Sequence, residues 1–148
     1  MNTEHLQTVL EETFAANFVA YYRAHVAHVN ITGRNFASDH TLLQKVYEDL
    51  QGNIDPLAEF IRTIGAMMPD SINTVLAISP FADDATAGDA DELLQLVLDD
   101  QERLMDLYKE LDAVAAEAGD VDIANYAQDR VGVHAKFRWM MRSTLELD

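Results

Sequence analysis

The sequence predicts an all-α protein that folds as a bundle of four long helices, with one long connection in the middle of the chain. Apolar residues recur at three- and four-residue steps in four separate segments, which places them on one face of a helix. No segment shows the strict alternation of apolar and polar residues that is typical of a half-buried strand. The longest stretch without a helical pattern, 67–85, contains Pro69 and Pro80 and forms the connection.

The first two helices are expected to form a hairpin. The first covers about Thr3–Ile31 and ends near Gly33, because glycine favours the turn that follows a helix. The second covers about Ser38–Ile64. Pro56 falls inside it, and an interior proline costs a helix about 3 kcal/mol and kinks it. We therefore expect a bend near Gly52.

The second half of the chain is expected to form another pair of long helices after the connection. A short helix is expected at Ser71–Ala77, the third long helix at Ala90–Ala118, where Gly119 ends it, and the fourth at Asp122–Leu147. Short first and last loops around a long crossover fit a ferritin-like four-helix bundle, here a single domain covering residues 1–148. An up-and-down or cytokine-like bundle would give the same pattern of helices.

The composition excludes several classes of protein. With 148 residues, 49% of them apolar, the chain can bury one substantial core. It contains no cysteine, which excludes disulfide bridges, thiolate metal ligands and cysteine nucleophiles. No apolar run reaches the roughly 18 residues of a membrane span, and no signal peptide is visible. We therefore expect a cytoplasmic protein that does not enter a membrane.

The charge is strongly acidic. The formal net charge is −16, from 26 acidic residues against 10 basic ones. Such a surface repels phosphate backbones, because affinity for nucleic acid comes largely from Lys and Arg, whereas it attracts cations. Direct DNA binding is therefore not expected, and the same charge is also typical of an ordinary soluble acidic protein.

Four side chains are candidate ligands for ferrous iron, which accepts imidazole and carboxylate groups. His28 lies near the end of the first helix and His40 near the start of the second, so an antiparallel hairpin brings them to the same end. Asp55 and Glu59 are four residues apart and share a helix face. Taken singly, such histidines are more often core or surface residues, and such an acid pair is more often simply solvated.

The spacing prevents His40 and Asp55 of one chain from binding the same metal ion. His40 and Asp55 are 15 residues apart on one predicted helix, which at 1.5 Å per residue is roughly 22 Å. Two copies can form the site if the second helix packs antiparallel against its mate across a two-fold axis. An intrachain di-iron centre would use Glu-x-x-His motifs, and no histidine here has an acid three residues before it.

The order of these residues is similar to a known pattern. The segment His28–Phe36 is followed by His40 and then by Asp55-x-x-x-Glu59. The last helix adds Asp129, Arg130, His134, Lys136 and Trp139. In this order and spacing the sequence resembles the Dps family of mini-ferritins over nearly its whole length.

The resemblance implies a ferroxidase and iron-storage protein that protects against oxidative stress. Such proteins are homo-oligomers, hollow dodecamers that bind ferrous iron at two-fold interfaces. They oxidise it preferentially with hydrogen peroxide, or with dioxygen, and store the ferric mineral inside. By position, His28 and His40 of one subunit with Asp55 and Glu59 of its neighbour would be the catalytic and metal-binding residues, with Glu59 as the bridging ligand.

The sequence departs from the family pattern in three places. Gln44 stands where the family usually has a ligating Asp, and a neutral amide binds iron less strongly than a carboxylate. Val29 replaces the usual Trp beside the first histidine, and Asn125 replaces an acid near the three-fold pore. Two alternative functions stay open: a non-catalytic scaffold whose site has decayed through Gln44, and protection of DNA by direct binding.

Overall fold

The computed structural model describes residues 3–86 and 88–147, and in these ranges the chain is helical with no strand. This confirms the predicted all-α class and the ferritin-like bundle. The helices are α1 (Thr3–Asn30), α2 (Phe36–Gly52), α3 (Ile54–Thr63), α4 (Ile72–Ile78), α5 (Ala90–Ala118) and α6 (Val121–Thr144). None of the helices in the described part of the chain is long and apolar enough to cross a membrane.

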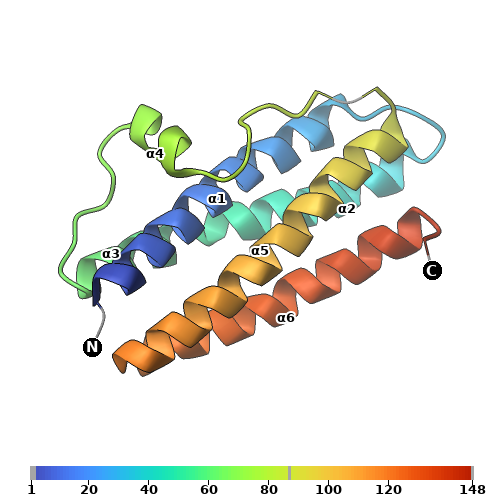
Figure 1. The fold of residues 1–148 in the computed structure, drawn as a ribbon. Helices are drawn as coiled ribbons and strands as arrows, with labels where there is room; N and C mark the ends of the chain where they lie inside the picture. The colour runs from blue at the N-terminus through green and yellow to red at the C-terminus, as the bar shows by residue number, and fades with distance from the viewer. Residues whose placement is uncertain (1–2, 87, 148) are drawn as a thin grey trace.

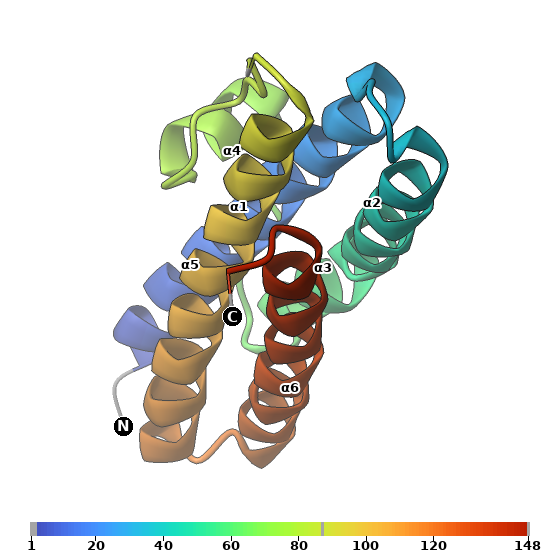
Figure 2. The same ribbon diagram turned by 90° about the vertical axis from the view of Figure 1, so that its right-hand side faces the viewer.

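The long helices form two antiparallel pairs. Helix α1 lies beside α2 and α3, which continue one another, and α5 lies beside α6 (Figures 1 and 2). The crossover leaves α3 at one end of the bundle and reaches α5 at the other, with α4 lying over α1 (Figure 1). This is the connectivity that the long proline-containing stretch predicted.

The second predicted helix is two helices rather than one bent helix. The bend expected near Gly52 is present, but Asn53 ends α2 and begins α3. Its side-chain Nδ2 donates to Oδ1 of Asn17 at 3.1 Å and to the hydroxyl of Tyr108 at 2.7 Å. Pro56 therefore lies in the first turn of α3, where the missing N–H removes no helical hydrogen bond.

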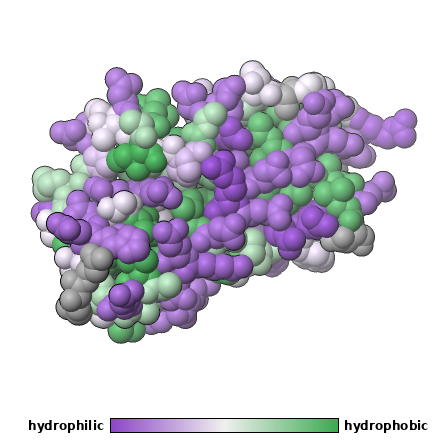
Figure 3. All heavy atoms as spheres, viewed as in Figure 1, coloured by the Kyte–Doolittle hydropathy of each residue, from purple (hydrophilic) through white to green (hydrophobic). Residues whose placement is uncertain are grey.

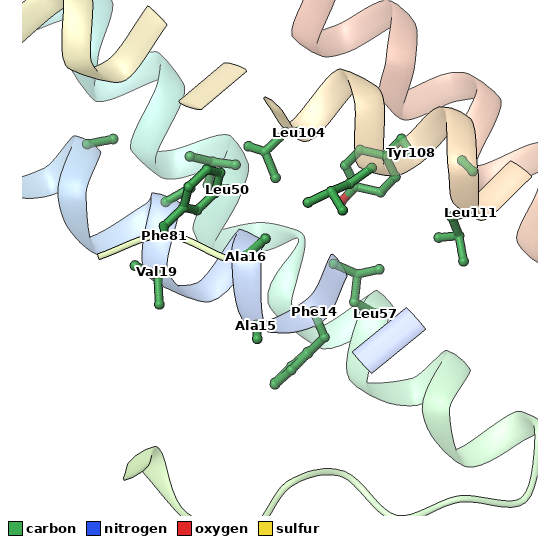
Figure 4. Close-up of a cluster of buried hydrophobic side chains, with 14 of the residues drawn as sticks. Phe14, Ala15, Ala16, Val19, Leu50, Leu57, Phe81, Leu104, Tyr108 and Leu111 are labelled. Atoms are coloured by element: carbon green, nitrogen blue, oxygen red, sulfur yellow. The ribbon is translucent and has the colours of Figure 1, made fainter. Parts of the chain in front are cut away.

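The core fills the space between the two pairs. Leucine side chains of α2, α3 and α5 meet there with Tyr108, whereas Phe14 of α1 points away from α5 toward the crossover (Figure 4). Phe81 of the crossover belongs to the same buried cluster. The labelled residues that lie fully buried at this level include Phe14, Leu50, Leu57, Leu104, Tyr108 and Leu111. Hydrophilic side chains cover most of the outer face in Figure 3, in keeping with the acidic composition.

The remaining helix boundaries follow the predictions closely. Gly119 ends α5 with a φ of 81°, a conformation that glycine adopts without strain, so the chain reverses into α6 after one further residue. Helix α6 ends at Thr144, three residues before the predicted Leu147. Arg23 of α1 holds the end of the crossover by donating to the carbonyl oxygens of Ala82 and Asp84.

Candidate metal centre

The loop after α1 turns back so tightly that His28 and His40 lie face to face. Their rings stack with centroids 3.7 Å apart and planes inclined by 17°. Nδ1 of His28 donates to the backbone carbonyl oxygen of His40 at 2.8 Å, and Nδ1 of His40 donates to that of His28 at 2.7 Å. The structure thus brings the two predicted histidines together at one end of the helical hairpin.

This reciprocal pair of hydrogen bonds determines which ring nitrogens can bind a metal. A backbone carbonyl only accepts, so the hydrogen of each neutral imidazole is on Nδ1 and the lone pair is on Nε2. Neither Nε2 makes a hydrogen bond within residues 3–86 and 88–147. A metal-binding histidine typically has this arrangement, with one nitrogen fixed by an acceptor and the other directed at the ion.

Further aromatic rings extend the pair along α1 and α2. Tyr47 stacks on His25 at 4.0 Å and 5°, and its ring centroid lies 5.0 Å from that of His28. On the other side, the ring of Phe36 lies 4.9 Å from that of His40. These contacts restrict the rotation of His28, which is 7% exposed, so its imidazole is held in one orientation.

Sequence reasoning missed the positions of Tyr47 and Phe36 relative to the histidines. In the sequence Tyr47 falls on the apolar face of the second predicted helix, which by itself indicates no more than a packing role. Its distance of seven residues from His40, two helical turns, places both on the same face and was the available signal. Phe36 begins α2 one turn before His40, so the same spacing argument applies to it.

The two predicted carboxylate ligands lie elsewhere in the subunit. Asp55 is in the first turn of α3 and Glu59 follows one turn later, and both side chains are exposed. Because α2 separates them from the histidine pair, the structure does not bring the four residues together. No group of three or more His, Cys, Asp or Glu side chains in the described part of a single chain is placed to hold a metal ion.

Gln44 lies one turn beyond His40 on the exposed face of α2. Its Nε2 donates to Oε1 of Glu48 at 2.6 Å. The carboxylate of Glu48 therefore lies within hydrogen-bonding distance of Gln44, at the position where the Dps pattern has a ligating Asp. Glu48 lies one turn beyond Gln44 and shares its exposed face of α2.

Comparison with known proteins shows the family to which the chain belongs. Residues 7–148 match the ferritin-like domain family. The chain is 32% identical to the DNA protection during starvation protein of Brevibacillus brevis, over 97% of each protein. It belongs to the Dps family of ferritin-like proteins.

Solved Dps structures have the same fold. The Dps protein from Bacillus brevis superposes with a TM-score of 0.91 at 26% identity, covering 97% of this chain and 96% of that one. A Dps protein from Vibrio cholerae, described as a member of a broad superfamily of ferritin-like diiron-carboxylate proteins, has a TM-score of 0.90 at 26% identity, with 97% and 90% covered.

Proposed function

We propose that this Dps-family chain oxidises ferrous iron at sites shared between two subunits and stores the ferric product inside a hollow homo-oligomer, a dodecamer by family resemblance. The observation that carries the proposal is the mutual fixing of His28 and His40 through Nδ1, which leaves both Nε2 lone pairs without a hydrogen-bond partner among the described residues. Two such nitrogens without carboxylates form half of a ferrous site. The proposed site is completed by Asp55 and Glu59 of the partner subunit.

The proposed site needs a two-fold axis beside α2 and α3. The histidine pair lies at the beginning of α2 and the acid pair in α3, so antiparallel packing of two copies sets each histidine pair against the other copy's acids. The contact repeats by symmetry and gives two sites per interface. Both carboxylates are exposed in the isolated subunit, as ligands donated to a neighbour have to be.

Each residue has a distinct part in the proposed reaction. The imidazoles of His28 and His40 position the ferrous ion, and the carboxylates of Asp55 and Glu59 neutralise its charge and favour the ferric state. Glu59 is the proposed bridging ligand between two iron positions. Ferrous iron is the substrate: two ferrous ions each lose one electron to become ferric, and the two electrons cleave the O–O bond of one hydrogen peroxide molecule to give two hydroxide ions, or two water molecules when two protons are taken up from solvent. Dioxygen is the alternative oxidant.

The decisive experiment removes one ligand from each side of the interface. We expect His40→Ala and Asp55→Ala each to abolish rapid oxidation of ferrous iron by peroxide, followed as ferric absorbance, while the oligomer stays assembled. His5→Ala is the matched control, because His5 lies in the first turns of α1, far along the chain from the pair. Parent-like rates in both site variants would rule out these residues.

Size measurement in solution tests the assembly separately. A stable monomer would exclude both the cage and the shared site, because a single chain does not join the two half-sites. A cage that assembles but oxidises no iron would instead support the alternative of a non-catalytic scaffold. The hydrogen bond between Gln44 and Glu48 favours that alternative, because it engages both side chains with each other.

A further inference from the structure

Opposite charges lie side by side at one end of the α5–α6 pair. The last turns of α6, residues 136–144, hold three basic side chains and no acidic one: Lys136, Arg138 and Arg142. The first half of α5, residues 89–102, holds six acidic side chains and no basic one: Asp89, Asp91, Glu92, Asp99, Asp100 and Glu102. Because the two helices run antiparallel, the basic segment 136–144 and the acidic segment 89–102 lie at the same end of the bundle (Figure 1). An ion pair between Arg138 and Glu102, at 3.0 Å, joins them within the subunit.

Trp139 is exposed in the middle of the basic segment. It is the only tryptophan in the sequence, and 63% of its surface is accessible in the isolated subunit. Lys136 lies one turn before it and Arg142 one turn after it, so the three side chains share a helix face. Tryptophan and arginine are among the residues most enriched at the positions that carry the binding energy of protein interfaces. A large indole with a positive charge on either side therefore has the composition of an interface anchor.

An open groove runs along the acidic segment of α5. Its acidic and apolar lining includes four residues: Glu92, Leu96, Asp99 and Glu102. Arg23 also lines it, but its Nε lies 2.7 Å from Oδ2 of Asp100. Arg103, at the end of the groove, donates to the carbonyl oxygen of Pro80 at 2.8 Å. Both arginines are therefore engaged within the subunit, and the groove presents carboxylates to an incoming cation and Leu96 to an incoming ring.

We infer that the basic segment around Trp139 docks on the acidic groove of α5 in another copy of this chain. Each subunit carries both surfaces at different positions, so the contact is head-to-tail and repeats until it closes into a ring. Charge favours a second copy as the partner. The chain carries −16 overall, so two copies repel one another wherever acidic surface faces acidic surface. The basic segment attracts the acidic surface of a neighbour instead, and Trp139 supplies apolar area to bury there.

The contact supplies what the proposed two-fold interface lacks. A two-fold contact is isologous and closes after two subunits, so a dodecamer needs a second, head-to-tail contact that joins the dimers. The proposed two-fold axis lies beside α2 and α3, whereas the docking surfaces lie on the other helical pair, so one subunit can make both contacts (Figure 2). The role as a joint between dimers rests on the proposed function. The contact itself requires no iron and is measured without it.

Because the sequence has a single tryptophan, the fluorescence of Trp139 reports the contact directly. We expect Lys136→Glu and Trp139→Ser each to stop at the two-fold dimer in analytical ultracentrifugation, with the helical circular dichroism of the parent. Quenching of Trp139 by acrylamide should be several-fold weaker in the assembled parent than in Lys136→Glu. The matched control is Lys109→Glu, which makes the same change of charge at an exposed position in the second half of α5, and should assemble like the parent.

Iron oxidation by the same samples separates this contact from the proposed function. Dimers of Lys136→Glu keep both halves of the proposed shared sites, so they should still oxidise ferrous iron. An assembled parent with a shielded Trp139 that oxidises no iron would support the contact and refute only the ferroxidase.

Three outcomes would overturn the inference. The first is that Lys136→Glu and Trp139→Ser both assemble like the parent. The second is that acrylamide reaches Trp139 as readily in the assembled parent as in Lys136→Glu. The third is that the parent stays a dimer and its Trp139 is shielded only when duplex DNA is added, because the basic segment would then bind nucleic acid rather than a second copy.

Discussion

The buried imidazole of His134 should make the protein less stable in mild acid. In the unfolded chain a histidine takes up a proton near pH 6.5, whereas burial and Arg130 lower the pKa of His134 well below this value in the folded protein. Below about pH 6.5 the unfolded chain therefore binds one more proton, and the free energy of unfolding falls as the pH falls. One such group gives at most about 1.4 kcal/mol per pH unit, or up to about 2.7 kcal/mol between about pH 6.5 and about pH 4.5.

The contribution of His134 can be isolated by a variant that does not titrate. His134→Gln keeps a polar side chain beside Gln101 and Arg130 but removes the ionisable group. Urea unfolding of parent and variant, followed by circular dichroism at roughly pH 7, 6 and 5, gives the difference in unfolding free energy at each pH. We expect the parent to lose stability on acidification more steeply than the variant. Equal pH slopes would show that His134 takes up its proton in the folded protein as readily as in the unfolded chain.

Three further outcomes are expected. Gln44→Asp should bind ferrous iron more tightly than the parent in an anaerobic titration, because it adds an anionic oxygen one turn from His40; unchanged affinity would show that position 44 does not reach the metal. Leu57→Ala should lower the free energy of unfolding in urea by about 2–5 kcal/mol, since the side chain is completely buried; a loss well below this range would mean that the core collapses into the space. The purified protein should not shift duplex DNA in a gel at physiological salt, because a dodecamer of chains with charge −16 carries about −192; a salt-sensitive shift without iron would contradict this.

Local patterns in the sequence predicted the helices, and contacts between distant segments account for what they missed. The bend near Gly52 was predicted, but the interruption of the helix at the single residue Asn53 was not. Asn53 is held there by Asn17 and Tyr108, which are 36 and 55 residues away in the chain. No property of the segment itself reveals those partners.

The difference between local patterns and contacts of distant residues also decides which site residues could be predicted. His28 and His40 were predicted to meet because a short turn joins their helices, and they do. Asp55 and Glu59 would meet the histidines only across a second subunit, which this structure does not contain, so their role as ligands stays a prediction. The interior pairing of Arg130 with Asp49 joins residues 81 positions apart, and neither residue carries a local signal that identifies its partner.

The break at Asn53 has a consequence for the assembly as a whole. The distance from His40 to Asp55 spans the end of α2, the break and the first turn of α3, so the geometry of this one residue sets the separation of the two half-sites. In a two-fold dimer the distance between the histidines and the carboxylates would be the same in both proposed shared sites. A small rotation at Asn53 would therefore misalign both sites at once. If the proposed shared sites form, the hydrogen bonds of Asn53 to Asn17 and Tyr108 in the core would therefore determine how well the two subunits fit together.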